Sequence, residues 1–201
     1  MSKKIKILPS DVGYDLAAGS YDEREKYLNS FEKDKLLPLL GKVDGLKILD
    51  AGAGTGRLAM KMAKMGASVV ALDVSEKMLE VLRKKNKIET IVGDVKSLPF
   101  EEGTFDWVVA AFLIVHIKDP GRFFDEAYRV LKDGGRLLVT NINQKEPPEV
   151  KTTEGPIKIE SYYHRPERIK EKLEELAFVV EREVLVKEGR NWVNQIIGAR
   201  K

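Results

Sequence analysis

The stretch Lys47-Ile-Leu-Asp-Ala-Gly-Ala-Gly-Thr-Gly56 decides the fold class of this 201-residue chain. An apolar run leads into three glycines at alternate positions, Gly52, Gly54 and Gly56. Glycine is used where the backbone takes a positive φ or comes close to a ligand, so the pattern predicts a buried strand that ends on an open ledge. Such a ledge is typical of a site for a nucleotide-like cofactor.

The spacing of the glycines distinguishes a dinucleotide cofactor from other nucleotide-like cofactors. The dinucleotide motif G-x-G-x-x-G has two residues before its third glycine, whereas here Thr55 alone separates Gly54 from Gly56. The acidic residue Asp50 precedes the ledge, and this arrangement suits a cofactor that has no phosphate. These features suit a cofactor that carries an amino acid with a positive charge. S-adenosylmethionine is the common molecule of that description.

Composition narrows the kinds of protein that this chain can be. It contains no cysteine, which excludes disulfides, thiolate metal sites and a covalent cysteine nucleophile. The hydrophobic content of 43% is enough for one buried core, so a single globular unit is expected. Because no apolar run is long enough to span a bilayer and no signal peptide is recognisable, we expect a cytoplasmic protein.

The charges of the chain are nearly balanced. Its 35 lysines and arginines stand against 32 acids, a net charge of +3, which neither requires nor excludes a nucleic-acid partner. Charged residues make up 33% of the sequence, and Gln144 and Gln195 are its only glutamines, a composition that resembles proteins from hot environments. Neither feature indicates a reaction.

Strand and helix patterns alternate along the chain. Apolar runs predict strands, and apolar residues three and four positions apart predict helices. The predicted strands after the first are 68–72, 88–92, 105–111, 136–140, 179–186 and 192–199. Helices are expected after the ledge, after Ser75, after Asp119-Pro120 and from Pro166, and one amphipathic helix over 22–40. The segment 141–164 is expected to be a long irregular loop with a short strand around 157–163.

This order of elements resembles that of the class I S-adenosylmethionine-dependent methyltransferases. The runs Ala71-Leu-Asp-Val-Ser-Glu-Lys-Met-Leu79 and Gly93 to Phe100 are similar to the subgroup that includes quinone-biosynthesis C-methyltransferases and other small-molecule enzymes. The resemblance implies an α/β, Rossmann-like, doubly wound sheet of seven strands with an antiparallel last strand, in a three-layer sandwich. It also implies a methyltransferase domain over 46–201, preceded by a helical lid or substrate segment over 1–45.

The resemblance assigns three acids at successive strand ends to the cofactor. Asp50 and the ledge would hold its methionine part, Asp73 its ribose hydroxyls and Asp94 its adenine amino group. The position of Asp73 is shared with NAD enzymes, and Asp94 separates the two families. The residues implied at the cofactor are Tyr21, Asp50, Ala51, Gly52, Gly54, Gly56, Asp73, Val74, Met78, Asp94, Val95 and Ala111.

Several of these residues have a plainer alternative. Asp73 could merely cap the helix that begins near Ser75, and Met78 could be ordinary core instead of lying under the adenine. Tyr21, in a tyrosine-aspartate pair ahead of the fold, is expected to close over the cofactor as a lid residue. The remaining alternative for the whole pattern is a tight turn without a ligand.

Methyl transfer needs little catalytic machinery, because a sulfonium already carries a good leaving group. In-line placement of the acceptor with water excluded is the main requirement, and a base is optional. No metal is expected. His116, after the fourth strand, is the candidate base, and its alternative is a structural hydrogen bond that shapes the loop before Asp119. His164 is expected on the solvated surface.

The acceptor is expected over the ends of the fourth and fifth strands. Its pocket would be bounded by 112–116, by 141–164 and by the N-terminal segment around Tyr14 and Tyr21. A small molecule is the leading acceptor, since no Asn/Asp-Pro-Pro-aromatic signature and no appended RNA-binding domain are present. An RNA or protein methyltransferase and a non-catalytic cofactor-binding module remain the alternatives.

Overall fold

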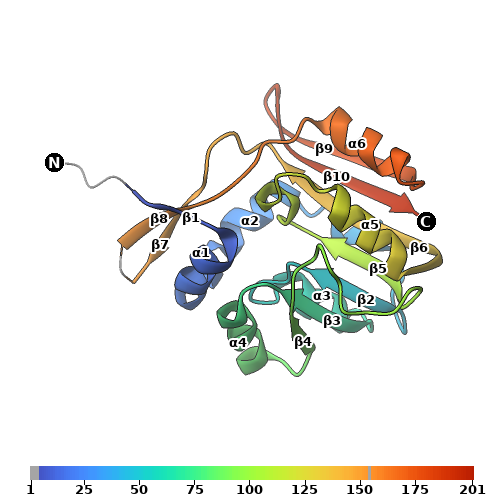
Figure 1. Ribbon diagram of the computed structural model, residues 1–201, viewed down its shortest axis with the longest axis horizontal. Helices are drawn as coiled ribbons and strands as arrows, with labels where there is room; N and C mark the ends of the chain where they lie inside the picture. The colour runs from blue at the N-terminus through green and yellow to red at the C-terminus, as the bar shows by residue number, and fades with distance from the viewer. Residues whose placement is uncertain (1–4, 154) are drawn as a thin grey trace.

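The computed structural model describes residues 5–153 and 155–201, and Figure 1 shows their arrangement. The strands are β1 (Ile7–Leu8), β2 (Lys47–Ala51), β3 (Ser68–Asp73), β4 (Glu89–Val92), β5 (Phe105–Ala110), β6 (Leu131–Ile142), β7 (Glu149–Thr152), β8 (Gly155–Ile159), β9 (Val179–Glu188) and β10 (Asn191–Arg200). The α-helices are α1 (Ser10–Ala17), α2 (Glu25–Glu32), α3 (Arg57–Lys64), α4 (Glu76–Lys85), α5 (Gly121–Val130) and α6 (Pro166–Glu175). Short 3₁₀ helices are η1 (Ala18–Arg24), η2 (Leu37–Leu40) and η3 (Ile114–His116).

The main sheet has seven strands in the order β4-β3-β2-β5-β6-β10-β9. The strands β2 to β6 pair in parallel, and β10 pairs antiparallel with both β6 and β9. The chain first builds outward from β2 to β4 and then returns to β5 on the other side of β2. This reversal leaves a crevice at the carboxyl ends of β2 and β5, where open α/β sheets bind their ligands.

Helices cover both faces of this sheet. Because side chains alternate along a strand, Leu49 and Ala51 pack on one face with α5 and α6, while Ile48 packs on the other with α3 and α4. The central strands β2, β3 and β5 are largely apolar on both sides for that reason. The predicted doubly wound sheet with its antiparallel last strand and three layers is confirmed.

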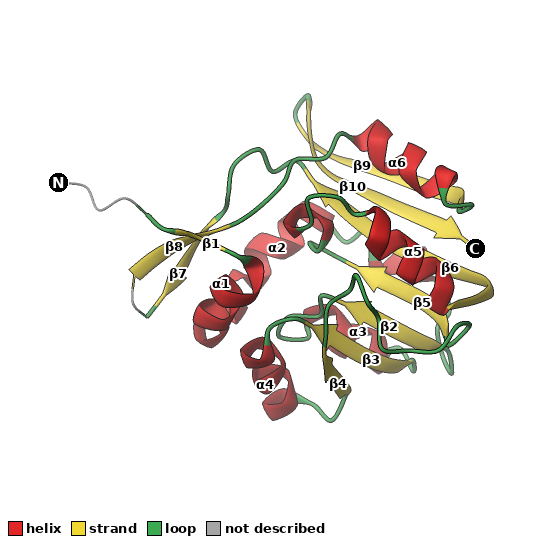
Figure 2. Ribbon diagram, viewed as in Figure 1, coloured by secondary structure: helices red, strands yellow, loops and turns green. Residues whose placement is uncertain are grey.

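A second, smaller sheet lies beside the first, and Figure 2 shows it apart from the main sheet next to α1. Its order is β1-β8-β7, with β1 parallel to β8 and the β7–β8 hairpin antiparallel. The expectation of an irregular loop over 141–164 was therefore wrong at β7, while the short strand expected around 157–163 corresponds in part to β8. Strand pairing with the distant N-terminal segment orders it, and such a partner leaves no local signal.

The amphipathic helix expected over 22–40 was also wrong. The segment divides into η1, α2 and η2, with Lys33 and Asp34 in left-handed conformation (φ 45° and 56°) between α2 and η2. Two such residues in succession end a helix. The break turns Leu36 and Leu40 into the core beside α3, where both are buried.

Within residues 5–153 and 155–201, none of the helices has the length and apolar character needed to cross a membrane.

Candidate functional site

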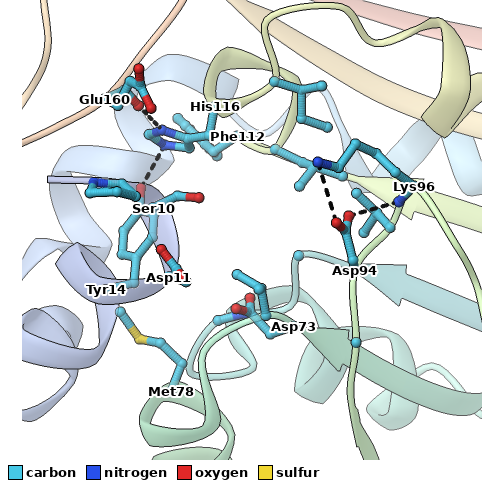
Figure 3. A pocket seen from close by; sticks show the side chains of 18 of the residues that line it. Ser10, Asp11, Tyr14, Asp73, Met78, Asp94, Lys96, Phe112, His116 and Glu160 are labelled. Carbon is cyan, nitrogen blue, oxygen red and sulfur yellow. Dashed lines mark hydrogen bonds and ion pairs between the residues drawn. The ribbon is translucent and has the colours of Figure 1, made fainter.

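A cavity of about 480 Å³ opens at the carboxyl ends of the parallel strands, beneath α1 and η1. Figure 3 shows Asp73 and Asp94 at one part of its wall and Tyr14, His116 and Glu160 at another. Its volume lies in the range of small-molecule sites. The predicted site residues that line it are Tyr21, Gly52, Gly54, Asp73, Val74, Met78, Asp94, Val95, Ala111 and His116.

The glycine ledge is open toward this cavity at Gly54. Gly54 has φ of 56°, and a Cβ built there would meet only the ring of Tyr21, at 3.9 Å. Gly52 has φ of 74°, and its N–H donates to the Leu72 carbonyl at 2.8 Å, which holds the ledge against β3. A side chain at Gly54 would fill the space in which a ligand can lie on the backbone.

Gly56 serves packing instead of the cavity wall. It precedes α3 with φ of 87°, and a Cβ there would overlap a methyl carbon of Leu82. Glycine is therefore required at this position by the contact between the ledge and α4. Ala51, fully buried, also lies behind the cavity and does not line it.

Asp73 stands at the junction of the ledge and α4. Its Oδ2 accepts from the N–H of Gly54 at 2.7 Å and its Oδ1 from the N–H of Ser75 at 2.9 Å. Ser75, not Asp73, caps α4, because its hydroxyl accepts from the N–H of Met78 at 3.1 Å. Burial raises the pKa of the Asp73 carboxyl, and the backbone donors oppose the rise. Each oxygen keeps a lone pair for a ligand hydroxyl.

The third acid is more exposed. Oδ1 of Asp94 accepts from the N–H of Lys96 at 2.9 Å, and the Lys96 ammonium lies 3.3 Å from Oδ2. Val95 beside it is buried, with 7% of its surface exposed. Met78 both lines the cavity and packs against α1 and the small sheet, so the two roles considered for it coincide in one position.

Asp50 lies behind the ledge on the side of α3 and does not line the cavity. Only 2% of its surface is exposed, and among the described residues its Oδ2 has no hydrogen-bond partner. Burial raises the pKa of this carboxyl to about 7, against the opposing effects of Arg57 and the backbone N–H of Ala59. Asp50 therefore lies outside the lining of the cavity, and its expected contact with the methionine part of the cofactor stays a prediction.

His116 is held at both ring nitrogens. Nδ1 lies 2.7 Å from the Glu160 carbonyl and Nε2 lies 2.7 Å from the Tyr14 hydroxyl. Because a carbonyl can only accept, Nδ1 carries the proton and Nε2 accepts from Tyr14. Burial lowers the pKa of His116, although the Glu160 carbonyl opposes this, so the ring is neutral near pH 7. The structural hydrogen bond considered for His116 exists, and the ring also faces the cavity.

His164 was expected on the solvated surface, and this was wrong. The ring is half-buried, and Nε2 lies 3.0 Å from the carbonyls of Ile114 and Ile117 at the two ends of η3. It fixes the backbone that carries His116. Its neighbours in sequence, Arg165 and Pro166, gave no indication of this contact.

Two features of the site were missed from the sequence. Tyr14 was expected only at the pocket boundary, yet it bonds to His116 across 102 positions of sequence. Lys96, which was not assigned to the site, also lines the cavity, whereas Glu160 lies in the segment 141–164 that was expected at its boundary. An aromatic residue ahead of the fold was a usable signal for Tyr14, but nothing local named its partner. In the described ranges, no group of three or more His, Cys, Asp or Glu side chains is arranged to hold a metal ion.

Known proteins that are similar to this chain in sequence include methyltransferases. A family model described as a methyltransferase domain matches residues 49–139. A demethylmenaquinone methyltransferase of Clavibacter sepedonicus is 35% identical over 147 residues, which cover 69% of this chain and 60% of that protein. One of Thermotoga maritima is 36% identical over 158 residues, 75% of this chain and 66% of that protein.

The chain belongs to the class I S-adenosylmethionine-dependent methyltransferases. The family and the methyl donor expected from the sequence are thereby confirmed. The chain spans about 60% of the length of the Clavibacter relative.

Solved structures show the same methyltransferase fold. A putative methyltransferase of Haloferax volcanii, in complex with the Trm112 methyltransferase activator, aligns with a TM-score of 0.79 at 16% identity, over 94% of this chain and 96% of that one. An S-adenosylmethionine-dependent methyltransferase of Mesorhizobium loti aligns with a TM-score of 0.73 at 20% identity, over 85% of this chain and 98% of that one. The open ledge at Gly54 and the free lone pairs of Asp73 fit the family's cofactor.

Proposed function

We propose that this methyltransferase transfers a methyl group to a small-molecule acceptor bound in the 480 Å³ cavity. The observation that carries the proposal is that one cavity joins the ledge and Asp73 to the Tyr14–His116 pair. A quinone-type aromatic acceptor is supported by the names of the Clavibacter and Thermotoga relatives. A cytoplasmic location stays a prediction.

The proposed binding roles follow the positions of the side chains. Gly52, Gly54 and Tyr21 would hold the methionine part, Asp73 the ribose hydroxyls, and Asp94 with Val95 the adenine. S-adenosylmethionine, when bound, supplies a methyl group on a sulfonium, which leaves readily as a thioether. The chain's own residues orient the acceptor and exclude water.

The Tyr14–His116 pair is the proposed route for the acceptor's proton. A hydroxyl or acidic carbon of the acceptor gives its proton to the Tyr14 oxygen while Tyr14 gives its own to Nε2 of His116. In the resulting imidazolium, the Nδ1–H still donates a hydrogen bond to the Glu160 carbonyl oxygen, which lies 2.7 Å from Nδ1. Burial raises the pKa of Tyr14 well above its ordinary value, so the hydroxyl remains protonated and acts as a relay.

We also propose that residues 5–45, the described part of the segment 1–45 expected from the sequence, work with the β7–β8 hairpin as a lid. Besides the pairs between α2 and α3, two acids of this lid contact the ledge and α4. Asp15 accepts from the Ser75 hydroxyl at 2.5 Å, and Asp22 accepts from the Thr55 hydroxyl at 2.6 Å and pairs with Lys85. Closure at these points would place Tyr21 over the ledge and keep water from the reacting atoms.

Labelled S-adenosylmethionine tests the proposal when it is incubated with the protein and separated small-molecule, RNA and protein fractions from the source cell. We expect label in the small-molecule fraction. On the acceptor so identified, His116→Ala and Tyr14→Phe should each lower kcat by about 100-fold or more while the Kd for S-adenosylhomocysteine stays within about twofold. Label confined to RNA or protein would overturn the small-molecule acceptor, and an unchanged kcat would leave positioning as the mechanism.

A further inference from the structure

A second, smaller cavity of about 40 Å³ lies behind the first. Four side chains line both cavities and form the wall between them: Tyr14, Tyr21, Phe112 and His116. On its far side the smaller cavity is bounded by Tyr27, Phe31 and Arg24. Six of its twelve lining residues are aromatic, with His116 counted among them, and Arg24 supplies one permanent positive charge.

That charge has no anionic partner within the described residues. The Arg24 guanidinium makes no ion pair and no hydrogen bond there, and it lies against the Tyr27 ring, whose centroid is 5.5 Å away. By contrast, Arg57 pairs with Glu32 at 2.6 Å in the adjacent core. Arg24 is half-buried, and an anion beside it would supply the charge-assisted hydrogen bonds that its guanidinium lacks.

The Arg24 charge faces the wall between the cavities. Burial raises the pKa of the Tyr21 hydroxyl, and Arg24 is the largest influence opposing that rise. Arg24 acts in the same direction on Tyr14, after the larger effects of burial and of Tyr21. Arg24, Tyr14 and Tyr21 line the same small cavity, so an anion at Arg24 would lie in a chamber that both tyrosines share with the reaction cavity.

The size of the chamber limits what can enter it. A volume of 40 Å³ accommodates roughly three water molecules, which is about the size of a carboxylate and less than that of an aromatic ring. We propose that this chamber is a carboxylate-binding subsite, in which Arg24 holds the carboxylate of a molecule whose body lies in the larger cavity. The assignment rests on the proposed function in taking the larger cavity as the reaction site.

Two molecules at that site can supply a carboxylate: the amino-acid part of the cofactor, or an acceptor that is itself a carboxylic acid. Arg24→Gln tests both. Lys26→Gln is the matched control, because it removes the same charge two residues away at an exposed position without a cavity. Circular dichroism and thermal unfolding of both variants establish that each is folded before binding is compared.

The cofactor is tested by calorimetric titration of S-adenosylhomocysteine and of 5′-methylthioadenosine, which lacks the amino acid. If the cofactor supplies the carboxylate, Arg24→Gln lowers the affinity for S-adenosylhomocysteine by about tenfold or more and leaves the affinity for methylthioadenosine unchanged. The acceptor is tested by titrating benzoate and its neutral counterpart benzamide into protein saturated with S-adenosylhomocysteine. If the acceptor is the source, benzoate binds the parent protein and not Arg24→Gln, and benzamide binds neither.

The proposed subsite is contradicted if Arg24→Gln changes the affinity for S-adenosylhomocysteine and for benzoate no more than Lys26→Gln does. That result is distinct from failure of the proposed function, which would appear as no binding of S-adenosylhomocysteine to the parent protein. Arg24→Lys, which keeps the charge and loses the planar fork, should restore part of the affinity of whichever ligand is affected.

Discussion

The carboxyl groups of Asp73 and Asp50, each at the end of a strand, have different surroundings. We therefore expect their substitutions to have different effects. Asp73 faces the cavity, is nearly buried and has two backbone donors. Asp50 lies behind the ledge with one oxygen unpartnered among the described residues. The first is suited to binding a ligand, and the second to setting how stability depends on pH.

Replacing Asp73 by Asn keeps the shape of the side chain and removes its charge. Because ribose hydroxyls would lose a charged acceptor, binding of S-adenosylhomocysteine should weaken by about 1–3 kcal/mol in calorimetric titration. Asp125→Asn, the same change at an exposed position on α5, should leave the affinity as it is. Equal affinity in the Asp73 variant would restrict this carboxylate to holding Gly54 and Ser75.

Asp50 should make the protein less stable as pH rises from about 4 to 7. Its folded pKa of about 7 exceeds the ordinary 3.8, so the folded state binds its proton more tightly than the unfolded chain does. The stability it contributes is complete below pH 4 and is lost by pH 7, on the order of 4 kcal/mol. Urea unfolding at pH 5 and pH 8 should therefore show a smaller difference for Asp50→Asn than for the parent. An identical difference in both proteins would contradict the raised pKa.

At the scale of elements, a buried ion pair ties α2 to the start of α3. Arg57 and Glu32 form two bonds, at 2.6 and 2.9 Å, with side chains only 11% and 7% exposed. A second pair between the same helices, Lys61 and Glu25 at 3.6 Å, is largely exposed. The two pairs join the same elements in different environments, which makes them a matched comparison.

Glu32→Ala should lower the free energy of unfolding by about 3–5 kcal/mol, because it leaves the Arg57 charge buried and unpaired. Glu25→Ala should lower it by less than about 1 kcal/mol, since solvent screens the exposed pair. Chemical denaturation of both variants provides the measurement. Losses of similar size would mean that burial does not distinguish the two pairs.

At the scale of the whole molecule, the small sheet and α1 cover a cavity whose other walls come from the strand ends of the main sheet and the loops that follow them. Figure 1 shows α1 between the small sheet and α4. Tyr14 and Tyr21 reach from this cover to the cavity wall, and their rings meet edge to face with centroids 5.6 Å apart. A ligand in the cavity therefore contacts both parts of the molecule and joins them.

Hydrogen exchange should report this coupling. Binding of S-adenosylhomocysteine should slow amide exchange in α1, η1, β7 and β8, because the ligand adds contacts that closure requires. Exchange in α6 and β9, on the far side of the main sheet, should change little. Equal protection with and without the ligand in the covering segments would remove their role as a lid.

The sequence by itself determined the main sheet and the cofactor side of the cavity. The glycine ledge, the Ser75 cap and the apolar strands depend on residues within a few positions of one another, so their chemistry is legible locally. Asp73 and Asp94 could be placed for the same reason, because parallel strands bring their carboxyl ends to one edge. The order of strands and helices along the chain therefore also predicts which residues lie near the carboxyl end of β2.

The sequence predicted which segments bound the other side of the cavity, but only the tertiary structure decided how they come together. The two-residue strand β1 is too short to show a period, and it pairs with β8 about 150 positions away, at Ile7 with Lys158. The Tyr14–His116 bond and the Arg57–Glu32 pair join segments that do not influence each other's local conformation. The pKa of Asp50 depends on how completely α3 buries it. These properties arise from packing between distant segments, which local residue patterns do not encode.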